Sequence, residues 1–137
     1  MGEIIQKYRV RTIPRGSGRL VTLYFDTGTE FSLMKTSVAE RLGHLHELGE
    51  PKQFGGLGNG RFLTRSIAYF EVCLLEFWCA HFAYVVEDRV LGDEYDVLIG
   101  HNFMQGFNVR CDPRRHRILL NRGSLRMAQR VHNAHAL

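Results

Sequence analysis

The apolar and aromatic run Leu20-Val21-Thr22-Leu23-Tyr24-Phe25 stops abruptly at Asp26-Thr27-Gly28-Thr29, and the apolar pattern resumes at Phe31-Ser32-Leu33-Met34. This pattern predicts a strand, a tight turn and a second strand. Gly28 permits the backbone geometry that such a turn needs. Asp26 then lies between two apolar strands, where an ionised carboxylate is costly unless another group pairs with it. Two interpretations stay open here: Asp26 caps a turn, or it is one carboxylate of an acid–base pair.

The size and composition of the chain describe one compact domain. It has 137 residues, of which 45% are apolar and 23% charged, as expected for a globular protein with a real core. No run approaches the 18 to 20 apolar residues of a membrane span, and the first residues lack a signal-peptide layout. Three cysteines are too few for a disulfide framework, which favours a reducing compartment. We therefore expect a cytoplasmic protein that does not contact membranes.

The net charge of +4 is unevenly distributed along the chain. Seven arginines and one aspartate from Arg110 onward give +6, which leaves −2 for residues 1–109. A basic end can attract nucleic acid, but this one lacks the interleaved aromatic residues that stack on bases. We therefore do not expect nucleic-acid binding, and we interpret residues 122–137 as a basic tail to which no structure is assigned.

The rest of the chain is dominated by short β-type segments. A short helix is expected near 37–42, where Ser37 and Glu40 have capping-box spacing and Gly43 suits a helix end, and a helical turn is expected after Gly100. We predict an all-β, barrel-like domain over residues 1–121 with one or two short helices. The predicted strands cover residues 3–13, 20–25, 31–34, 62–75, 77–86, 95–99, 107–110 and 116–120.

A glycine-rich stretch, Phe54-Gly55-Gly56-Leu57-Gly58-Asn59-Gly60-Arg61, lies between two of these segments. It does not fit a phosphate-binding loop, because Arg61 stands where the motifs need glycine or lysine and a β-type segment follows instead of a helix. We interpret it as the tip of a hairpin, where four glycines in six residues indicate a mobile loop, a close backbone approach to a ligand, or both. His44 and His46 lack the further ligands of a metal set, so we expect neither a metal nor a cofactor.

Three elements in order resemble the retropepsin family, the single-domain aspartic proteases of retroviral type. They are Asp26-Thr27-Gly28 after an apolar strand, the glycine-rich hairpin, and Leu98-Ile99-Gly100 before a short helix. The resemblance covers residues 20 to 120 and implies a homodimeric aspartic endopeptidase that acts on extended polypeptides. It implies catalytic roles for Asp26, Thr27 and Gly28. It also implies substrate contacts from Thr29, Glu30, Gly55, Gly56, Leu57, Gly58, Asn59 and Gly60, and support from Leu98, Ile99, Gly100 and His101.

Aspartic-protease chemistry needs two carboxylates that share one proton, and this chain carries one Asp-Thr-Gly. The partner of Asp26 is then expected to be Asp26 of a second copy across a two-fold axis. Two such charges about 4 Å apart repel by about 4 kcal/mol at an effective dielectric of 20, so the pair retains one proton. By the same resemblance, Thr27 braces the two catalytic loops across the dimer, and the glycine-rich hairpin is the flap that closes over substrate.

The sequence departs from the retroviral pattern at one ion pair. Retroviral enzymes commonly tie an acid two residues after the motif's glycine to an arginine that follows the later glycine. Here these positions hold Glu30 and His101, so we hypothesise a contact between them that depends on pH. Two other functions remain as alternatives: a retropepsin-like domain that dimerises or binds peptides with little turnover, and an unrelated β-barrel that binds nucleic acid.

Overall fold

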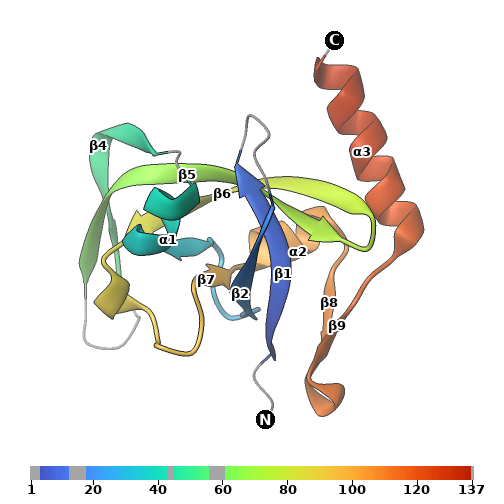
Figure 1. Ribbon diagram of the computed structural model, residues 1–137, viewed down its shortest axis with the longest axis horizontal. Coiled ribbons are helices and arrows are strands. Elements are labelled where there is room, and N and C mark those ends of the chain that lie inside the picture. The colour runs from blue at the N-terminus through green and yellow to red at the C-terminus, as the bar shows by residue number, and fades with distance from the viewer. Residues whose placement is uncertain (1–3, 13–17, 43–44, 56–60, 137) are drawn as a thin grey trace.

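A computed structural model of the chain describes residues 4–12, 18–42, 45–55 and 61–136, the last six of them as helical backbone alone. Two 3-10 turns, at Asp88–Val90 and Pro113–Arg115, accompany the strands and helices (Figure 1). The elements are β1 (Ile4–Thr12), β2 (Arg19–Phe25), β3 (Leu33–Lys35), α1 (Thr36–Leu42), β4 (His46–Phe54), β5 (Phe62–Leu74), β6 (Phe77–Val86), β7 (Val97–Ile99), α2 (His101–Gly106), β8 (Arg110–Asp112), β9 (Arg117–Leu119) and α3 (Arg122–Ala136).

Six of the strands close into a barrel in the order β1-β2-β7-β3-β6-β5, and β1 pairs with β5 to complete the ring. The β2–β7 and β3–β6 pairs are parallel and the other pairs antiparallel, so the barrel is mixed. At the closing seam Arg11 lies opposite Glu71 and forms an ion pair with it at 2.7 Å. β4 pairs with the outer edge of β5. The mostly-β, barrel-like prediction is therefore confirmed for the single chain.

The barrel interior is filled by alternate residues of the long strands, as the two-residue period of a strand requires. Along β2, for example, Val21, Leu23 and Phe25 are buried, while the residues between them are half-buried. A second, smaller cluster lies around Leu33, Val86, Leu91 and Leu98. The sheet therefore has an apolar layer besides the barrel core, and this second layer forms one side of the site described below.

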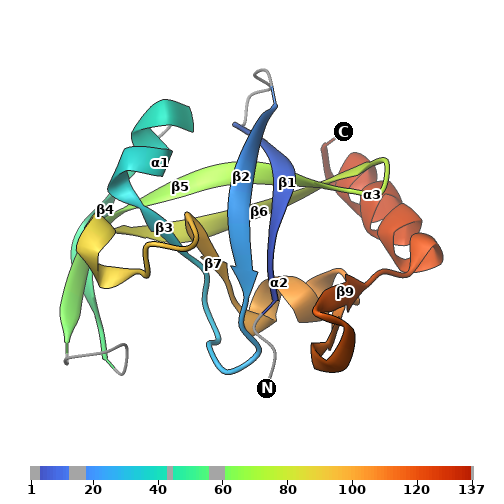
Figure 2. The same ribbon diagram turned by 60° about the horizontal axis from the view of Figure 1, so that its bottom comes forward.

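The ends of two parallel strands bring distant sequence motifs together. Phe25, the last residue of β2, is in register with Ile99, the last residue of β7. Because the two strands run in the same direction, Asp26 and Gly100 leave the sheet side by side. This topology places the turn after β2 against the start of α2, at the end of the barrel visible near the bottom of Figure 2.

Two elements were not predicted from the sequence. β4 begins at His46, where we predicted no strand, and its residues have low strand propensity. It is a strand because it pairs with β5, with an irregular register between Glu47 and Lys52. The pairing of Phe54 with Phe62 confirms the predicted hairpin around the glycine-rich stretch; residues 56–60 themselves, like Gly43 at the predicted helix end, lie outside the described ranges.

The second unpredicted element is α3, a helix of 15 residues in the segment to which we assigned no structure. It packs against β6 (Figure 1) through a fully buried Leu125, and the Gln129 side chain donates a hydrogen bond to the Trp78 carbonyl. Local helix propensity does not predict a helix whose stability depends on such tertiary contacts. Among the described helices, none is both long and apolar enough to cross a membrane.

The start of α1 also differs from the predicted capping box. Ser37 lies inside the helix, and its backbone N–H donates to the Asp88 carboxylate at 3.1 Å. This hydrogen bonding from Ser37 lowers the pKa of Asp88. The cap therefore comes from the 3-10 turn after β6 and not from the helix's own first residues.

Replacing Leu125 by alanine tests whether α3 is part of the folded domain. We expect the free energy of unfolding in urea to fall by about 2–4 kcal/mol, because the side chain is fully buried against the barrel. Met127→Ala on the same helix is the matched control, since that side chain is 58% exposed. Equal, small effects of the two substitutions would contradict the packing of α3.

Candidate active site

The carboxylate of Asp26 is half-buried and is held by its own loop. The Gly28 N–H donates to Oδ1 at 2.9 Å, and the Thr29 hydroxyl donates to Oδ2 at 3.0 Å. Each carboxylate oxygen thus accepts one hydrogen bond, which fixes the plane of the group. A side chain at position 28 would approach Oδ1 to 3.2 Å, so glycine leaves this carboxylate accessible.

The loop after β2 is attached to the start of α2 through the backbone. The Asp26 N–H donates to the Ile99 carbonyl at 3.0 Å, the His101 N–H to the Thr29 carbonyl at 2.7 Å, and the Asn102 N–H to the Glu30 carbonyl at 3.0 Å. Gly100 lies so close to this loop that an added Cβ would be 2.5 Å from the Phe31 carbonyl oxygen. Glycine is therefore required for the two segments to cross.

Ser32 and His81 support this crossing from the inside. The Ser32 hydroxyl is buried, accepts a hydrogen bond from the Gly100 N–H at 3.0 Å, and lies 2.9 Å from His81 Nε2. Burial of the imidazole lowers the pKa of His81 to about 4, so the ring is neutral near pH 7. Depending on its tautomer, Nε2 either accepts a hydrogen bond from the Ser32 hydroxyl or donates one to it. Sequence reasoning missed both residues, because nothing local pairs position 32 with position 81.

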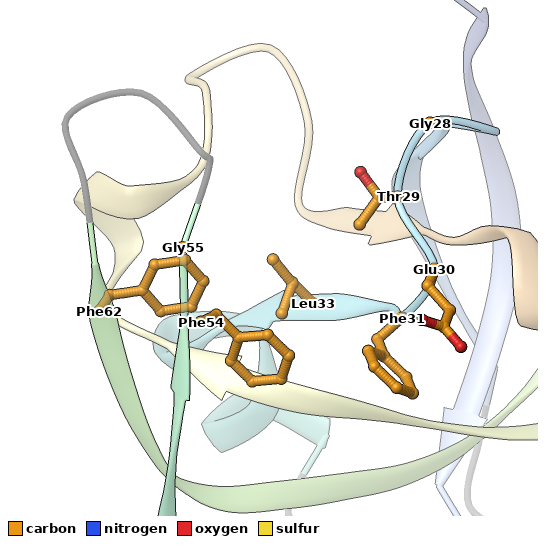
Figure 3. Close-up of a pocket in the computed structure, with 8 residues that line it drawn as sticks. All are labelled: Gly28, Thr29, Glu30, Phe31, Leu33, Phe54, Gly55 and Phe62. Atoms are coloured by element: carbon orange, nitrogen blue, oxygen red, sulfur yellow. The ribbon is translucent and has the colours of Figure 1, made fainter.

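A cavity of about 300 Å³ opens beside the Asp26 loop. Figure 3 shows Leu33 between the loop residues on one side and the aromatic rings of the β4–β5 hairpin on the other. Phe54 and Phe62, the last strand pair before the hairpin loop, stack with their ring centroids 5.5 Å apart. The lining is therefore mostly apolar, with Glu30 as its charged member. The residues are Gly28, Thr29, Glu30, Phe31, Leu33, Phe54, Gly55 and Phe62.

Lys52 ties the hairpin strand β4 to the body of the domain. Its ammonium group lies 4.4 Å from the ring centre of Phe31, 4.8 Å from that of Tyr84 and 5.3 Å from that of Phe54. It also donates to the Tyr84 hydroxyl at 3.1 Å. Cation–π contacts of this kind are attractive, so Lys52 holds β4 against Phe31, the residue directly after Glu30 in the Asp26 loop.

The predicted site residues separate into three groups. Asp26, Thr27, Gly28, Thr29 and Glu30 form one loop, in which Thr27, Gly28 and Glu30 are exposed. Gly55 faces this loop across the cavity, whereas Gly56, Leu57, Gly58, Asn59 and Gly60 lie outside the described residues. The supporting residues Leu98, Ile99, Gly100 and His101 follow one another behind the loop, the first three of them buried.

The hypothesised contact concerns the side chains of Glu30 and His101, whereas the structure connects these two segments through backbone hydrogen bonds. Both side chains are exposed, and within the described ranges no ion pair joins them. The hydrogen bonds of residues 101 and 102 to the carbonyls of Thr29 and Glu30 connect the two segments instead. In the described part of the chain, no three His, Cys, Asp or Glu side chains gather as a metal site would require.

Comparison with known proteins identifies the fold. No protein-family model matches the sequence, and no curated protein sequence matches it. The retroviral protease-like domain of Ddi1 from Leishmania major superposes with a TM-score of 0.60 at 19% identity, over 86% of this chain and 89% of that domain. The EIAV protease complexed with the inhibitor HBY-793 superposes with a TM-score of 0.51 at 17% identity, over 79% of this chain and 92% of that protease. The chain has the fold of retroviral protease-like domains.

Substituting Gly100 by alanine tests the crossing of the two segments. The added methyl group would meet backbone atoms of Phe31 and Glu30 within 2.8 Å, so we expect the free energy of unfolding to fall by about 3 kcal/mol or more. Gly106→Ala is the control, because nothing lies within 4 Å of its added Cβ and alanine suits a helix. A loss of the same size in both variants would contradict a special role for Gly100.

The burial of His81 predicts a specific pH dependence of stability. The pKa of His81 is about 4 in the folded chain and near 6.5 in the unfolded chain. Between these pH values the unfolded chain therefore binds more protons than the folded chain. Stability is therefore lost as the pH falls through this window. Compared with His81→Gln, the wild-type protein should lose about 2–3 kcal/mol between pH 7 and pH 4.5, measured by urea unfolding at each pH. A wild-type-to-variant difference that stayed constant with pH would contradict a buried neutral imidazole.

Proposed function

We propose that the chain is the protomer of a homodimeric aspartic endopeptidase that hydrolyses extended polypeptides. The observation that carries this proposal is the carboxylate of Asp26, which is held by Gly28 and Thr29 at the end of the barrel, beside an apolar cavity, in a fold shared with retroviral proteases. Among the described residues, no hydrogen bond joins Asp26 to a second carboxylate. The second acid of the reaction would come from Asp26 of another copy.

The proposed chemistry follows from this pairing. One Asp26 carboxylate takes a proton from a water molecule, which attacks the peptide carbonyl, while the other Asp26 donates the shared proton to the carbonyl oxygen. The hydrogen bonds from Gly28 and Thr29 would keep both carboxylates near one plane as the charge moves between them. Thr27, which is exposed in the single chain, would brace the two loops across the dimer.

The cavity and the hairpin would bind the substrate. Phe31, Leu33, Phe54 and Phe62 offer apolar surface for a substrate side chain. The glycine-rich segment 55–60 would act as the flap and exclude water from the reacting bond. Lys52 would set the position of that flap, because it bonds β4 to Tyr84 and Phe31.

Mixing wild-type chains with Asp26→Asn chains tests catalysis and the shared site together. We expect Asp26→Asn alone to cleave a mixed peptide library at least about 10²–10⁴-fold more slowly, while the exposed Asp93→Asn cleaves normally. With a ninefold excess of Asp26→Asn chains, activity per wild-type chain should fall to about a tenth, because most wild-type chains then pair with an inactive partner. The same excess of Asp93→Asn chains, which are active themselves, should leave the activity per total chain unchanged.

Two results would contradict the proposal. Undiminished activity per wild-type chain in the mixture would show that one chain contains a complete site. Undetectable cleavage by the wild-type dimer, over a broad pH range and with diverse peptides, would favour a domain that dimerises or binds peptides without turnover.

A further inference from the structure

The C-terminal part of the chain presents a surface of arginines. All seven arginines from Arg110 onward are exposed, and residues 110–130 contain neither a lysine nor a Phe, Tyr or Trp. We call these residues the arginine surface: Arg110, Arg114, Arg115, Arg117, Arg122, Arg126 and Arg130. None of them is part of the site around Asp26.

Two adjoining elements carry the arginine surface. Figures 1 and 2 place the β8–β9 hairpin and α3 on the same side of the molecule, connected by a short link. In the hairpin, Arg110 and Arg117 lie on the face opposite to Cys111 and the buried Ile118, because neighbouring residues of a strand point to opposite faces. On α3, three arginines follow at intervals of four residues, which forms a row with steps of about 6 Å.

Most of the positive charge on this surface is unneutralised. Arg115 lies 3.8 Å from the Asp112 carboxylate, and Arg122 forms an ion pair with Glu76. The other five arginines form no ion pair within the described part of the chain: Arg110, Arg114, Arg117, Arg126 and Arg130. Five free guanidinium groups on ordered elements are complementary to a partner with regularly repeated negative charge.

The orientation of α3 argues against a membrane as that partner. An interfacial helix buries its apolar face in the lipid, but here the apolar face is already occupied. Leu125 is fully buried against the barrel, and the Gln129 side chain is bonded to the Trp78 carbonyl. In residues 122–130, whose side chains the structure describes, α3 therefore offers mainly charge to a partner, with Met127 as its exposed apolar side chain.

We propose that the arginine surface binds the phosphodiester backbone of a nucleic-acid duplex. The exclusive use of arginine fits phosphate, because the planar guanidinium donates two parallel hydrogen bonds to its oxygens. The lack of aromatic residues excludes stacking on unpaired bases but does not affect contacts to a duplex backbone, which carry affinity without sequence specificity. This proposal departs from the sequence-based expectation against nucleic acid, whose argument from missing aromatic residues applies to single strands and not to a duplex.

Fluorescence anisotropy of the full chain with a labelled 20-base-pair DNA duplex tests the proposal. The variant Arg117→Gln/Arg126→Gln/Arg130→Gln removes three of the free arginines. The control Arg19→Gln/Arg41→Gln/Arg65→Gln removes the same charge from exposed positions elsewhere. We expect the first variant to bind at least about tenfold more weakly than the control at 100 mM salt. The slope of log K against log salt should be about −4.5 for the wild type, with five contacts, and about −2 for the first variant, with two contacts.

The replacement of the same three arginines by lysine provides a variant with unchanged charge. We expect it to keep the salt slope but to bind more weakly than wild type, because lysine lacks the two-pronged geometry. Equal weakening by the two glutamine triples would overturn the proposal in favour of a general effect of net charge. Competition by poly-L-glutamate as effective as unlabelled duplex, at equal charge concentration, would overturn it in favour of an acidic polypeptide.

Discussion

The close crossing of two backbone segments underlies the rest of this structure. The loop after β2 and the start of α2 approach until no side chain fits at Gly100, and three backbone hydrogen bonds then join them. Buried backbone groups must be paired, and here each segment supplies the partners of the other. The position of the Asp26 carboxylate at the end of the barrel is thus a consequence of main-chain geometry.

In the proposed enzyme, this geometry would supply half of a two-carboxylate site. Asp26 receives its hydrogen bonds from its own loop, so the single chain can hold the group in place before any partner arrives. Thr27 and Gly28 remain exposed beside it, where a second copy or a substrate backbone could approach. A site divided in this way would make proteolysis depend on the concentration of the chain, since an isolated protomer holds one acid alone.

Different interactions hold the inner and the outer side of the site. The Ser32–His81 pair stiffens the inner side of the loop with a neutral, buried ring. On the outer side, Lys52 lies among three aromatic rings next to the hairpin loop, where each cation–π contact is attractive but of modest strength. The arginine surface belongs to different elements, so contacts there need not disturb either part.

The sequence alone determined those features that depend on short-range pattern. Alternating apolar residues predicted most of the strands, Asp26-Thr27-Gly28 predicted the turn and its acid, and the glycine-rich stretch predicted a hairpin, because each is specified by neighbours within a few residues. The tertiary structure decided the rest. β4 is a strand through its pairing with β5, and α3 is ordered by packing on β6. Asp88 caps a helix 51 residues away, and Ser32 meets His81 across 49 residues. Contacts of this range follow from the order of strands in the closed barrel, which no local preference specifies.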